Sequence, residues 1–198
     1  MIFLTRRDIL TLDPLSVLSG DNMLKGPRVE LRTIQAGDAP LMYRWHNDPR
    51  VASEMGMRHT LFATSMEEER TALQRIVATS SEQYLIIQLK GGRPIGYASL
   101  ARIDLRNASA RLTVVIGEPA EWGNGYGKEV TSLLTNYAFN VLNIHRLYLR
   151  VPDYNQRAIR CFTACGFQKE GTLRDDHFHL GSYRSSHLMS ILREECQR

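Results

Sequence analysis

Hydrophobic and polar positions along the chain follow two different periods, and this divides it into strands and helices. From 28 to 32, polar and apolar residues alternate, which predicts a half-buried strand. Two helices are expected next. Asp38 can cap the first, with Pro40 just inside it, and Ser65 and Glu68 have capping-box spacing at the start of the second. Their apolar positions are Leu41, Met42 and Trp45 in the first and Met66, Leu73, Ile76 and Val77 in the second.

The middle of the chain changes to strands and then to a long helix. Residues 84–89 are nearly all apolar, Gly91-Gly92 is typical of a hairpin turn, and 94–105 continue as a partner strand. A third strand is expected at 111–116. The period then becomes helical, with one apolar face made by Val130, Leu133, Leu134, Tyr137, Ala138 and Val141.

The last part of the chain completes an α/β pattern. A strand at 147–151 precedes a short helix that Gly166 ends, and strands at 167–178 and 183–192 can form a hairpin. This order predicts a mixed, mostly antiparallel sheet of about six to seven strands flanked by about four helices. The strands at 111–116 and 147–151 should be parallel, joined by a right-handed crossover.

Chain length and composition indicate how many domains to expect. With 198 residues, of which 43% are hydrophobic, the chain is long enough for one substantial core and short for two. Regular patterning begins only after the Gly26-Pro27 break. We therefore expect an N-terminal arm at 1–25 and a single domain at 26–198.

Charge and cysteine content bear on partners and location. The formal net charge of +4 favours an anionic ligand, but the basic residues are scattered, so no nucleic-acid partner is expected. No segment has the length of a membrane span, and no membrane association is expected. The three cysteines have no Cys-x-x-Cys spacing, which favours a reducing, cytoplasmic location over a disulfide framework or a structural zinc site.

A glycine-rich run between the third central strand and the long helix carries the clearest chemical signal. It reads WGNGYGK at 122–128, and its alternate glycines allow positive φ angles, so that successive N–H groups can converge on a phosphate at a helix N-terminus. A connector chosen only for turning is the alternative. A P-loop is disfavoured because Lys128-Glu129 replaces its Lys-Ser/Thr pair, and a Rossmann site because His145 and Arg146 stand where an acid is needed.

Several short runs together resemble the GNAT acetyltransferases. They are VVIG at 114–117, WGNGYG at 122–127, NQRA at 155–158 and CGF at 165–167, and the resemblance extends over residues 27–195. Within this superfamily, the chain most resembles the branch that contains the ribosomal-protein alanine acetyltransferases. The resemblance implies the GNAT fold, an α/β fold whose sheet is splayed at the centre.

The resemblance also implies an activity. GNAT enzymes move an acetyl group from acetyl-CoA to a primary amine by direct attack in a ternary complex. The acceptor would be a protein N-terminus or a small-molecule amine such as an aminosugar, a polyamine or an antibiotic. The expected partners are therefore acetyl-CoA and an amine, with no metal, and the protein is expected as a monomer or homodimer.

By resemblance, the cofactor lies along the end of the central strand. The backbone at Val115 and Ile116 would pair with pantetheine, and the amides of the glycine-rich run would hold the pyrophosphate at the positive end of the long helix. Asn155 would bond the pantetheine, although a helix N-cap suits it equally well. The expected cofactor-binding residues are Val115, Ile116, Trp122, Gly123, Asn124, Gly125, Tyr126, Gly127, Lys128 and Asn155.

Two departures from the family pattern concern proton transfer. Phe162 stands where many relatives have a Tyr that protonates the departing thiolate, and Arg111 stands where many have a Glu base. Glu118 is a weak candidate base, with an exposed loop carboxylate as the alternative. The amine can still react through proximity, with the carbonyl polarised by a backbone N–H. A non-catalytic acyl-CoA-binding module is the alternative function.

Three further features are candidates for the acceptor side. Asp175 and Asp176, expected between the last two strands, could attract a cationic amine, or they could lie at a solvated hairpin tip. Trp45 resembles a family residue near the acceptor, but the pattern favours a buried aromatic on a short helix. His177 and His179 share one strand face as a metal pair would, with no third ligand evident. Cys161 and Cys165 have the spacing of core residues on one helix face, so covalent catalysis is not expected.

Overall fold

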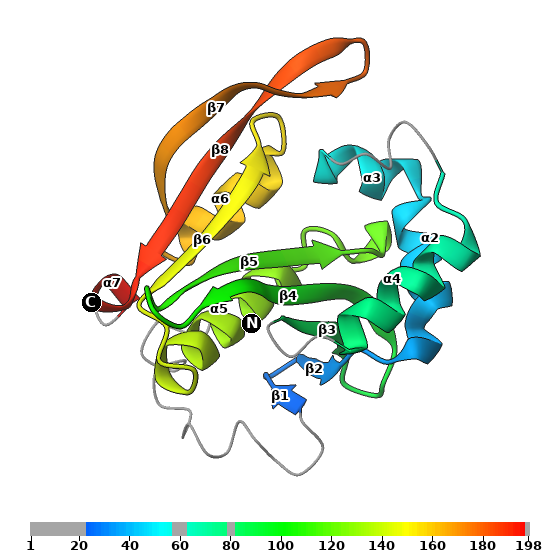
Figure 1. The fold of residues 1–198 in the computed structure, drawn as a ribbon, viewed down its shortest axis with the longest axis horizontal. Coiled ribbons are helices and arrows are strands. Elements are labelled where there is room, and N and C mark those ends of the chain that lie inside the picture. The colour runs from blue at the N-terminus through cyan, green and yellow to red at the C-terminus, as the bar shows by residue number, and fades with distance from the viewer. Residues whose placement is uncertain (1–22, 57–62, 79–81, 197–198) are drawn as a thin grey trace.

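A single mixed sheet organises the computed structural model, which describes residues 23–56, 63–78 and 82–196. Among these residues the sheet has eight strands in the order β1-β2-β3-β4-β5-β6-β8-β7 (Figure 1). The strands are β1 (Met23–Lys25), β2 (Val29–Thr33), β3 (Gln83–Leu89), β4 (Pro94–Asp104), β5 (Ser109–Ile116), β6 (Arg146–Pro152), β7 (Gln168–His179) and β8 (Ser182–Leu192).

Helices pack on both faces of this sheet. They are α2 (Ala39–His46), α3 (Pro49–Met55), α4 (Met66–Ala78), α5 (Tyr126–Asn140), α6 (Gln156–Ala164) and α7 (Arg193–Cys196), with short 3₁₀ turns η1 (Ala36–Asp38) and η3 (Pro119–Glu121). Along β3, Leu85 and Ile87 belong to a core with α5 and α6, whereas Ile86 belongs to a second core with α2, α3 and α4. The alternation of a strand therefore separates an α5–α6 face from an α2–α4 face (Figure 1).

The sheet opens at its one parallel pair. The expected parallel pairing is confirmed, but β5 and β6 pair only at Ser109–Arg146, Ala110–Leu147 and Arg111–Tyr148. Beyond Arg111 the two strands diverge, as their arrows in Figure 1 show. The splayed centre that the family resemblance implies is therefore present.

Both predicted helix starts are in the expected positions, but only one has the expected capping hydrogen bonds. At α4, Ser65 N donates to Glu68 Oε2 at 2.7 Å and Glu68 N donates to Ser65 Oγ at 3.1 Å, which confirms the capping box. At α2 the expected cap is wrong, since Asp38 makes no side-chain cap bond. Its carboxylate instead accepts from Arg32 at 2.6 and 2.8 Å and from Gln35 N at 2.8 Å. Val77, predicted as buried, is 54% exposed.

Some elements have no counterpart in the sequence pattern. Residues 23–25, which the sequence places in the arm, form β1 and pair with β2, and Leu24 is buried in the α5–α6 core. This strand raises the count above the expected six to seven. Asp48 caps α3 by accepting from Arg50 N at 2.9 Å. Residues 1–22 of the expected arm lie outside the described residues.

Candidate functional site

A cavity of about 590 Å³ occupies the gap where β5 and β6 diverge. Both strands, the glycine-rich run, the start of α5, α6 and the end of α3 line it. The lining includes every expected cofactor-binding residue except Asn124. Because the gap passes through the sheet, the cavity has one half on the α5–α6 face and another on the α2–α4 face.

The glycine-rich run turns the chain from the end of β5 into α5. Gly123 and Gly125 both have φ near +83°, and Gly125 precedes the first helical residue. The N–H groups of Tyr126, Gly127 and Lys128 in the first turn have no intrahelical acceptor. Gly127 does not have the expected positive φ, because it already belongs to α5. The result is a set of free amides at a helix N-terminus beside the cavity, as a phosphate site needs.

An ion pair that the sequence did not suggest anchors this loop to β2. Glu129 Oε1 accepts from the backbone N–H groups of Arg28 and Val29 at 2.8 and 3.1 Å, and Glu129 Oε2 accepts from Arg28 Nε at 2.9 Å. Arg28 Nη1 also donates to the Asn124 carbonyl at 2.9 Å, and its guanidinium lies 4.9 Å from the Tyr126 ring. We call this set of contacts the Arg28–Glu129 clamp. A Glu in the first helical turn ordinarily indicates only a favourable dipole interaction, so no sequence signal identified its partner.

Cationic side chains surround the α5–α6 half of the cavity. Lys128, Arg157 and Arg160 line it, and the Arg157 guanidinium lies 3.9 Å from the centre of the Trp122 ring. Trp122 Nε1 donates to the Ile116 carbonyl at 2.7 Å, which fixes the ring against the end of β5. Arg157 belongs to the NQRA run at 155–158, one of the runs that resemble the GNAT family, but the sequence predicted no role for its side chain. This half can therefore attract an anionic ligand.

Asn155 fills the alternative role and also lies at the cavity. Its Oδ1 accepts from Ala158 N at 2.9 Å, which makes it the N-cap of α6, and its Nδ2 donates to the Glu54 carbonyl at 2.9 Å. The side chain thus connects the start of α6 to the end of α3. A bond to pantetheine stays a prediction.

The two departures from the family pattern both line the cavity. Phe162 is 8% exposed and packs 5.8 Å from Phe167, ring centre to ring centre. Arg111 is the last β5 residue paired with β6, and its Nε is buried with no hydrogen-bond partner among the described residues. The cavity therefore has a phenyl ring on one face of the sheet and a cation at the point of divergence.

Glu118 and Trp45 contact each other outside the cavity lining. Trp45 is 1% exposed, and its Nε1 donates to Glu118 Oε1 at 2.9 Å. Arg44 forms an ion pair with the same carboxylate. A Cβ at Gly117 would lie 2.3 Å from the Trp45 ring, so the indole packs against bare backbone. The structure thus places Trp45 in the α2–α4 core rather than at an acceptor surface, and Glu118 holds it there.

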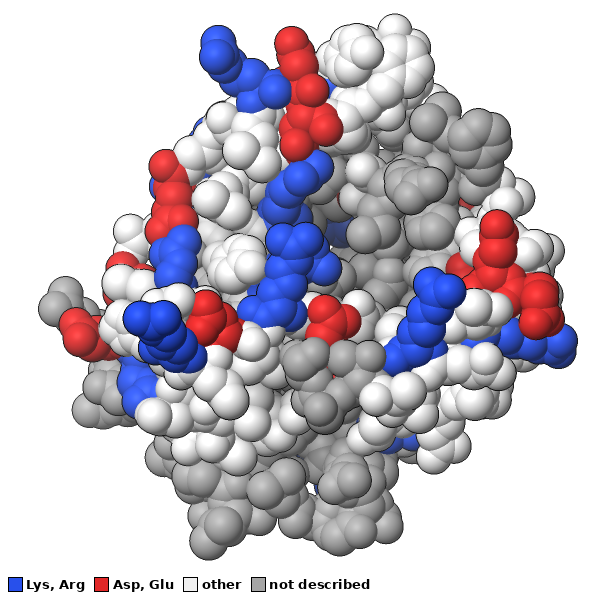
Figure 2. Space-filling view, in the orientation of Figure 1, with Lys and Arg blue, Asp and Glu red and all other residues white. Residues whose placement is uncertain are grey.

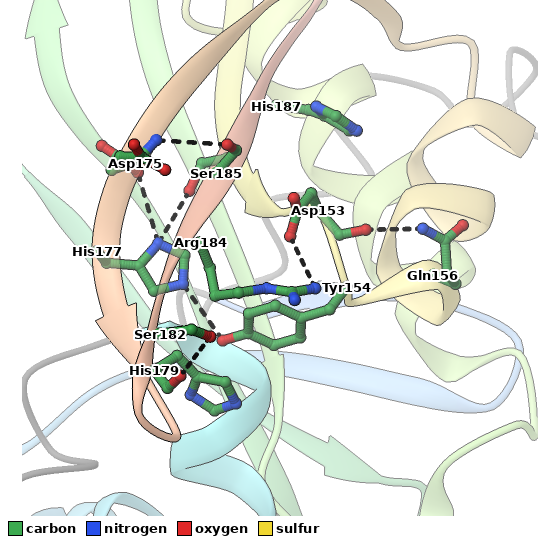
Figure 3. Close-up of polar contacts among 12 residues, drawn as sticks. Asp153, Tyr154, Gln156, Asp175, His177, His179, Ser182, Arg184, Ser185 and His187 are labelled. Atoms are coloured by element: carbon green, nitrogen blue, oxygen red, sulfur yellow. Dashed lines mark hydrogen bonds and ion pairs between the residues drawn. The ribbon is translucent and has the colours of Figure 1, made fainter.

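The two candidate acids of the last hairpin differ in environment. Asp175 is exposed with φ of +48° in a bulge of β7, and Figure 3 shows it beside Ser185, whose Oγ is 3.4 Å from Asp175 N. Asp176 is directed to the cavity side, where it forms an ion pair with Arg150, a lining residue. Asp176 therefore does not present a free negative charge to an acceptor.

The two histidines of β7 pack on Tyr154. The His179 ring stacks on it with centres 4.5 Å apart, and His177 Nε2 is 3.4 Å from Tyr154 Oη (Figure 3). Tyr154 donates to the Ser53 carbonyl at 2.8 Å. Burial raises the pKa of Tyr154 to about 12, and burial with the nearby His177 lowers the pKa of His179. Within the described ranges, no group of three or more His, Cys, Asp or Glu residues is arranged to hold a metal ion.

Cys161 and Cys165 contact each other between α5 and α6. The hydrogen bond to Cys165 and burial raise the pKa of the Cys161 thiol, which keeps it protonated. A protonated thiol is a poor nucleophile, so Cys161 is not favoured for covalent catalysis; the same hydrogen bond lowers the pKa of the Cys165 thiol, for which the expectation stays a prediction.

Among the described residues, no helix has both the length and the apolar character that crossing a bilayer requires.

Similar proteins are known for most of the length of this chain. Residues 28–168 match the family model described as "Acetyltransferase (GNAT) domain". The protein named "Uncharacterized N-acetyltransferase p20" of Bacillus licheniformis is 30% identical over 172 residues, which cover 85% of this chain and 94% of that protein. Spermidine N(1)-acetyltransferase of Vibrio cholerae is 24% identical over 168 residues, covering 85% and 95%.

A solved structure agrees in fold. The crystal structure of spermidine N-acetyltransferase from Vibrio cholerae in complex with CoA and spermine has a TM-score of 0.80 to this chain. The match has 24% sequence identity and covers 87% of this chain and 100% of that one.

Proposed function

The chain belongs to the GNAT acetyltransferase family, and from this premise we propose that its central cavity holds acetyl-CoA in the α5–α6 half and the acceptor in the α2–α4 half. The protein is an acetyl-CoA-dependent N-acetyltransferase that acts on a primary amine. The observation that carries the proposed division is the gap beyond Arg111, because it connects the two faces of the sheet at one point.

The α5–α6 half suits coenzyme A in both shape and charge. The free amides of Tyr126, Gly127 and Lys128 and the left-handed Gly123 and Gly125 form a cradle for a pyrophosphate. Arg157 and Arg160 add positive charge beside it. Past Arg111, none of the described strands pairs with the β6 side of β5, so the backbone near Val115 and Ile116 can pair with pantetheine, while the Ile116 carbonyl also accepts from Trp122 Nε1. Asn155, at the start of α6, lies opposite.

Acetyl-CoA supplies the activated acetyl group, and the residues of the chain hold the thioester and the amine in position. A backbone N–H of β5 polarises the acetyl carbonyl, and the gap brings the amine to it from the other face of the sheet. Phe162 has no proton to donate, so the departing thiolate takes one from water or from the acceptor. Glu118 bonds Trp45 and Arg44 outside the cavity lining, which does not favour it as the base.

The acceptor class is open to several amines. Relatives named as spermidine acetyltransferases make polyamines one candidate class, beside aminosugars, amine antibiotics and protein N-termini. These relatives do not favour the narrower resemblance to the ribosomal-protein alanine acetyltransferase branch. A cytoplasmic location, a monomeric or homodimeric state and an N-terminal arm before the domain complete the proposal, with the start of the domain moved from residue 26 to β1 because Leu24 is buried in the α5–α6 core.

Two measurements test the proposed site together. Acetyl-CoA should stabilise the native state by about 2.7 kcal/mol at a hundredfold excess over its Kd, and NAD and ATP should do much less. With an amine panel, free coenzyme A thiol should then be released. Stabilisation without thiol release would favour a non-catalytic acyl-CoA-binding module, and equal protection by NAD would contradict the assignment of the cavity.

A further inference from the structure

The acceptor half of the cavity contains an arginine without a counterion. Arg111 lies on the same face of β5 as Val115, which packs in the core with α2. Burial raises the pKa of Tyr84 on β3 of that face, and the nearby charge of Arg111 opposes this shift. Its Nε is buried, and the guanidinium makes no hydrogen bond or ion pair to the described residues. Arg111 as a whole is half-buried, and its buried Nε lacks a partner that a ligand in the cavity can supply.

The remaining charges of this half are already matched. Arg150 lines it and forms an ion pair with Asp176, while the Glu54 carboxylate lies 3.6 Å from Arg157 Nη2. On the side of the molecule seen in Figure 2, Lys and Arg side chains lie next to Asp and Glu side chains. The acids of the acceptor half are therefore balanced by neighbouring arginines, and the charge of Arg111 is left over.

We propose that the acceptor carries an anionic group, a carboxylate or a phosphate, which binds Arg111 while its amine reaches the gap between β5 and β6. The inference rests on the proposed division of the cavity. A guanidinium recognises both anions through charge-assisted hydrogen bonds. A polycation would bring like charge to an already unpaired cation, and among the residues that the structure describes, no unpaired acid lines this half to offset the repulsion.

The test compares amines that differ only at the far end. Pentylamine, 5-aminopentanoate and 1,5-diaminopentane present a methyl, an anion and a cation, and ethanolamine with 2-aminoethyl phosphate forms the phosphate arm. Binding to the protein saturated with coenzyme A is measured by calorimetry, and turnover by thiol release. The anionic members should exceed the diamine by about tenfold or more in affinity and in kcat/KM, the usual effect of one hydrogen bond to a charged group.

Three variants assign the preference to its residue. Arg111→Gln should abolish it, Arg111→Lys should keep part of it, and Arg106→Gln should leave it intact. Arg106 is the matched control because it is exposed on the turn between β4 and β5, where the same charge is lost outside the cavity. Coenzyme A affinity should stay normal in all three, which shows that each is folded.

The outcomes separate the inference from the function on which it rests. A diamine that binds as tightly as the anionic amines, an anion preference that survives Arg111→Gln, or no binding by any of these amines would overturn the inference. Stronger response to 2-aminoethyl phosphate than to 5-aminopentanoate would identify phosphate as the anion, and the reverse a carboxylate. Failure of the wild type to bind coenzyme A would instead contradict the proposed function.

Discussion

Removal of the Glu129 side chain should loosen the proposed cofactor loop and destabilise the fold. In Glu129→Ala, the N–H groups of Arg28 and Val29 lose their acceptor. Val29 is fully buried, so its amide cannot turn to water. Each unsatisfied buried amide costs about 1–3 kcal/mol. The ion pair adds about 0–1 kcal/mol, because the Arg28 side chain is 51% exposed and screened.

The expected loss is therefore about 2–4 kcal/mol in the free energy of unfolding, since water offsets part of the Arg28 amide's share. Glu129→Gln keeps one oxygen for the two amides but turns an NH₂ group toward Arg28, so it should cost about 1 kcal/mol. Arg28→Ala keeps both amide bonds and should cost less than Glu129→Ala. It removes the bond to the Asn124 carbonyl, so it should weaken coenzyme A binding severalfold with little change in stability.

Urea unfolding followed by circular dichroism measures the first effect, and calorimetric titration with coenzyme A measures the second. The reasoning predicts an order of stability loss, Glu129→Ala above Glu129→Gln and Arg28→Ala. If Glu129→Ala unfolded within about 0.5 kcal/mol of the wild type, the two amides would not depend on this carboxylate, and the energetic role of the Arg28–Glu129 clamp would be refuted.

Three further outcomes are expected. Gly125→Asp should abolish coenzyme A binding by calorimetry because it places an acid in the phosphate cradle, whereas Gly91→Asp, at a glycine with comparable positive φ in the hairpin turn, should leave binding unchanged; equal loss in both would point to backbone strain. The hydrogen bonds from Arg146 hold the pKa of Glu170 at about 2, so their stabilisation is complete above about pH 4.5 and lost as the pH falls toward 2; Glu170→Gln should flatten that part of an acid unfolding curve, and an unchanged curve would count against the pair. Phe162→Tyr should raise kcat modestly and add a loss of activity near about pH 10 as the phenol ionises, and a pH-rate profile identical to the wild type would show that the ring does not face the sulfur.

The fold was predictable where a periodic pattern reflects burial on one face. The helix that carries Val130 and the strands around the Gly91-Gly92 turn repeat over enough residues to define their buried sides. A strand of three residues, such as β1, contains no full period and was missed. The Asp38 carboxylate has two possible partners, the N-terminus of a helix and Arg32. Only the folded chain brings the Arg32 guanidinium close enough to bind it, so the sequence did not identify this pair.

The candidate site was predictable where its residues are close in sequence. The glycine-rich run indicates a tight turn into a helix, and the structure has that turn. The Arg28–Glu129 clamp joins residues 101 positions apart, and no spacing rule connects them. Trp45 resembles an acceptor contact by its local sequence, but its packing on Gly117 places it in the core, which is the alternative that the sequence favoured.

The two departures from the family pattern lie on opposite faces of the sheet, and this separates their consequences. Phe162 belongs to the α5–α6 half, where the thiolate would leave, so that end of the reaction lacks a side-chain acid. Arg111 belongs to the acceptor half, where a base is usual. A neighbouring cation disfavours an ammonium group and lowers its pKa, so Arg111 increases the neutral fraction of an amine beside it. A general base would otherwise deprotonate the amine. Arg111 favours the deprotonated amine through its charge, without accepting a proton itself. An anion of the acceptor that binds Arg111 offsets this charge, so the same residue either lowers the pKa of an amine that carries no anion or positions an amine that carries one.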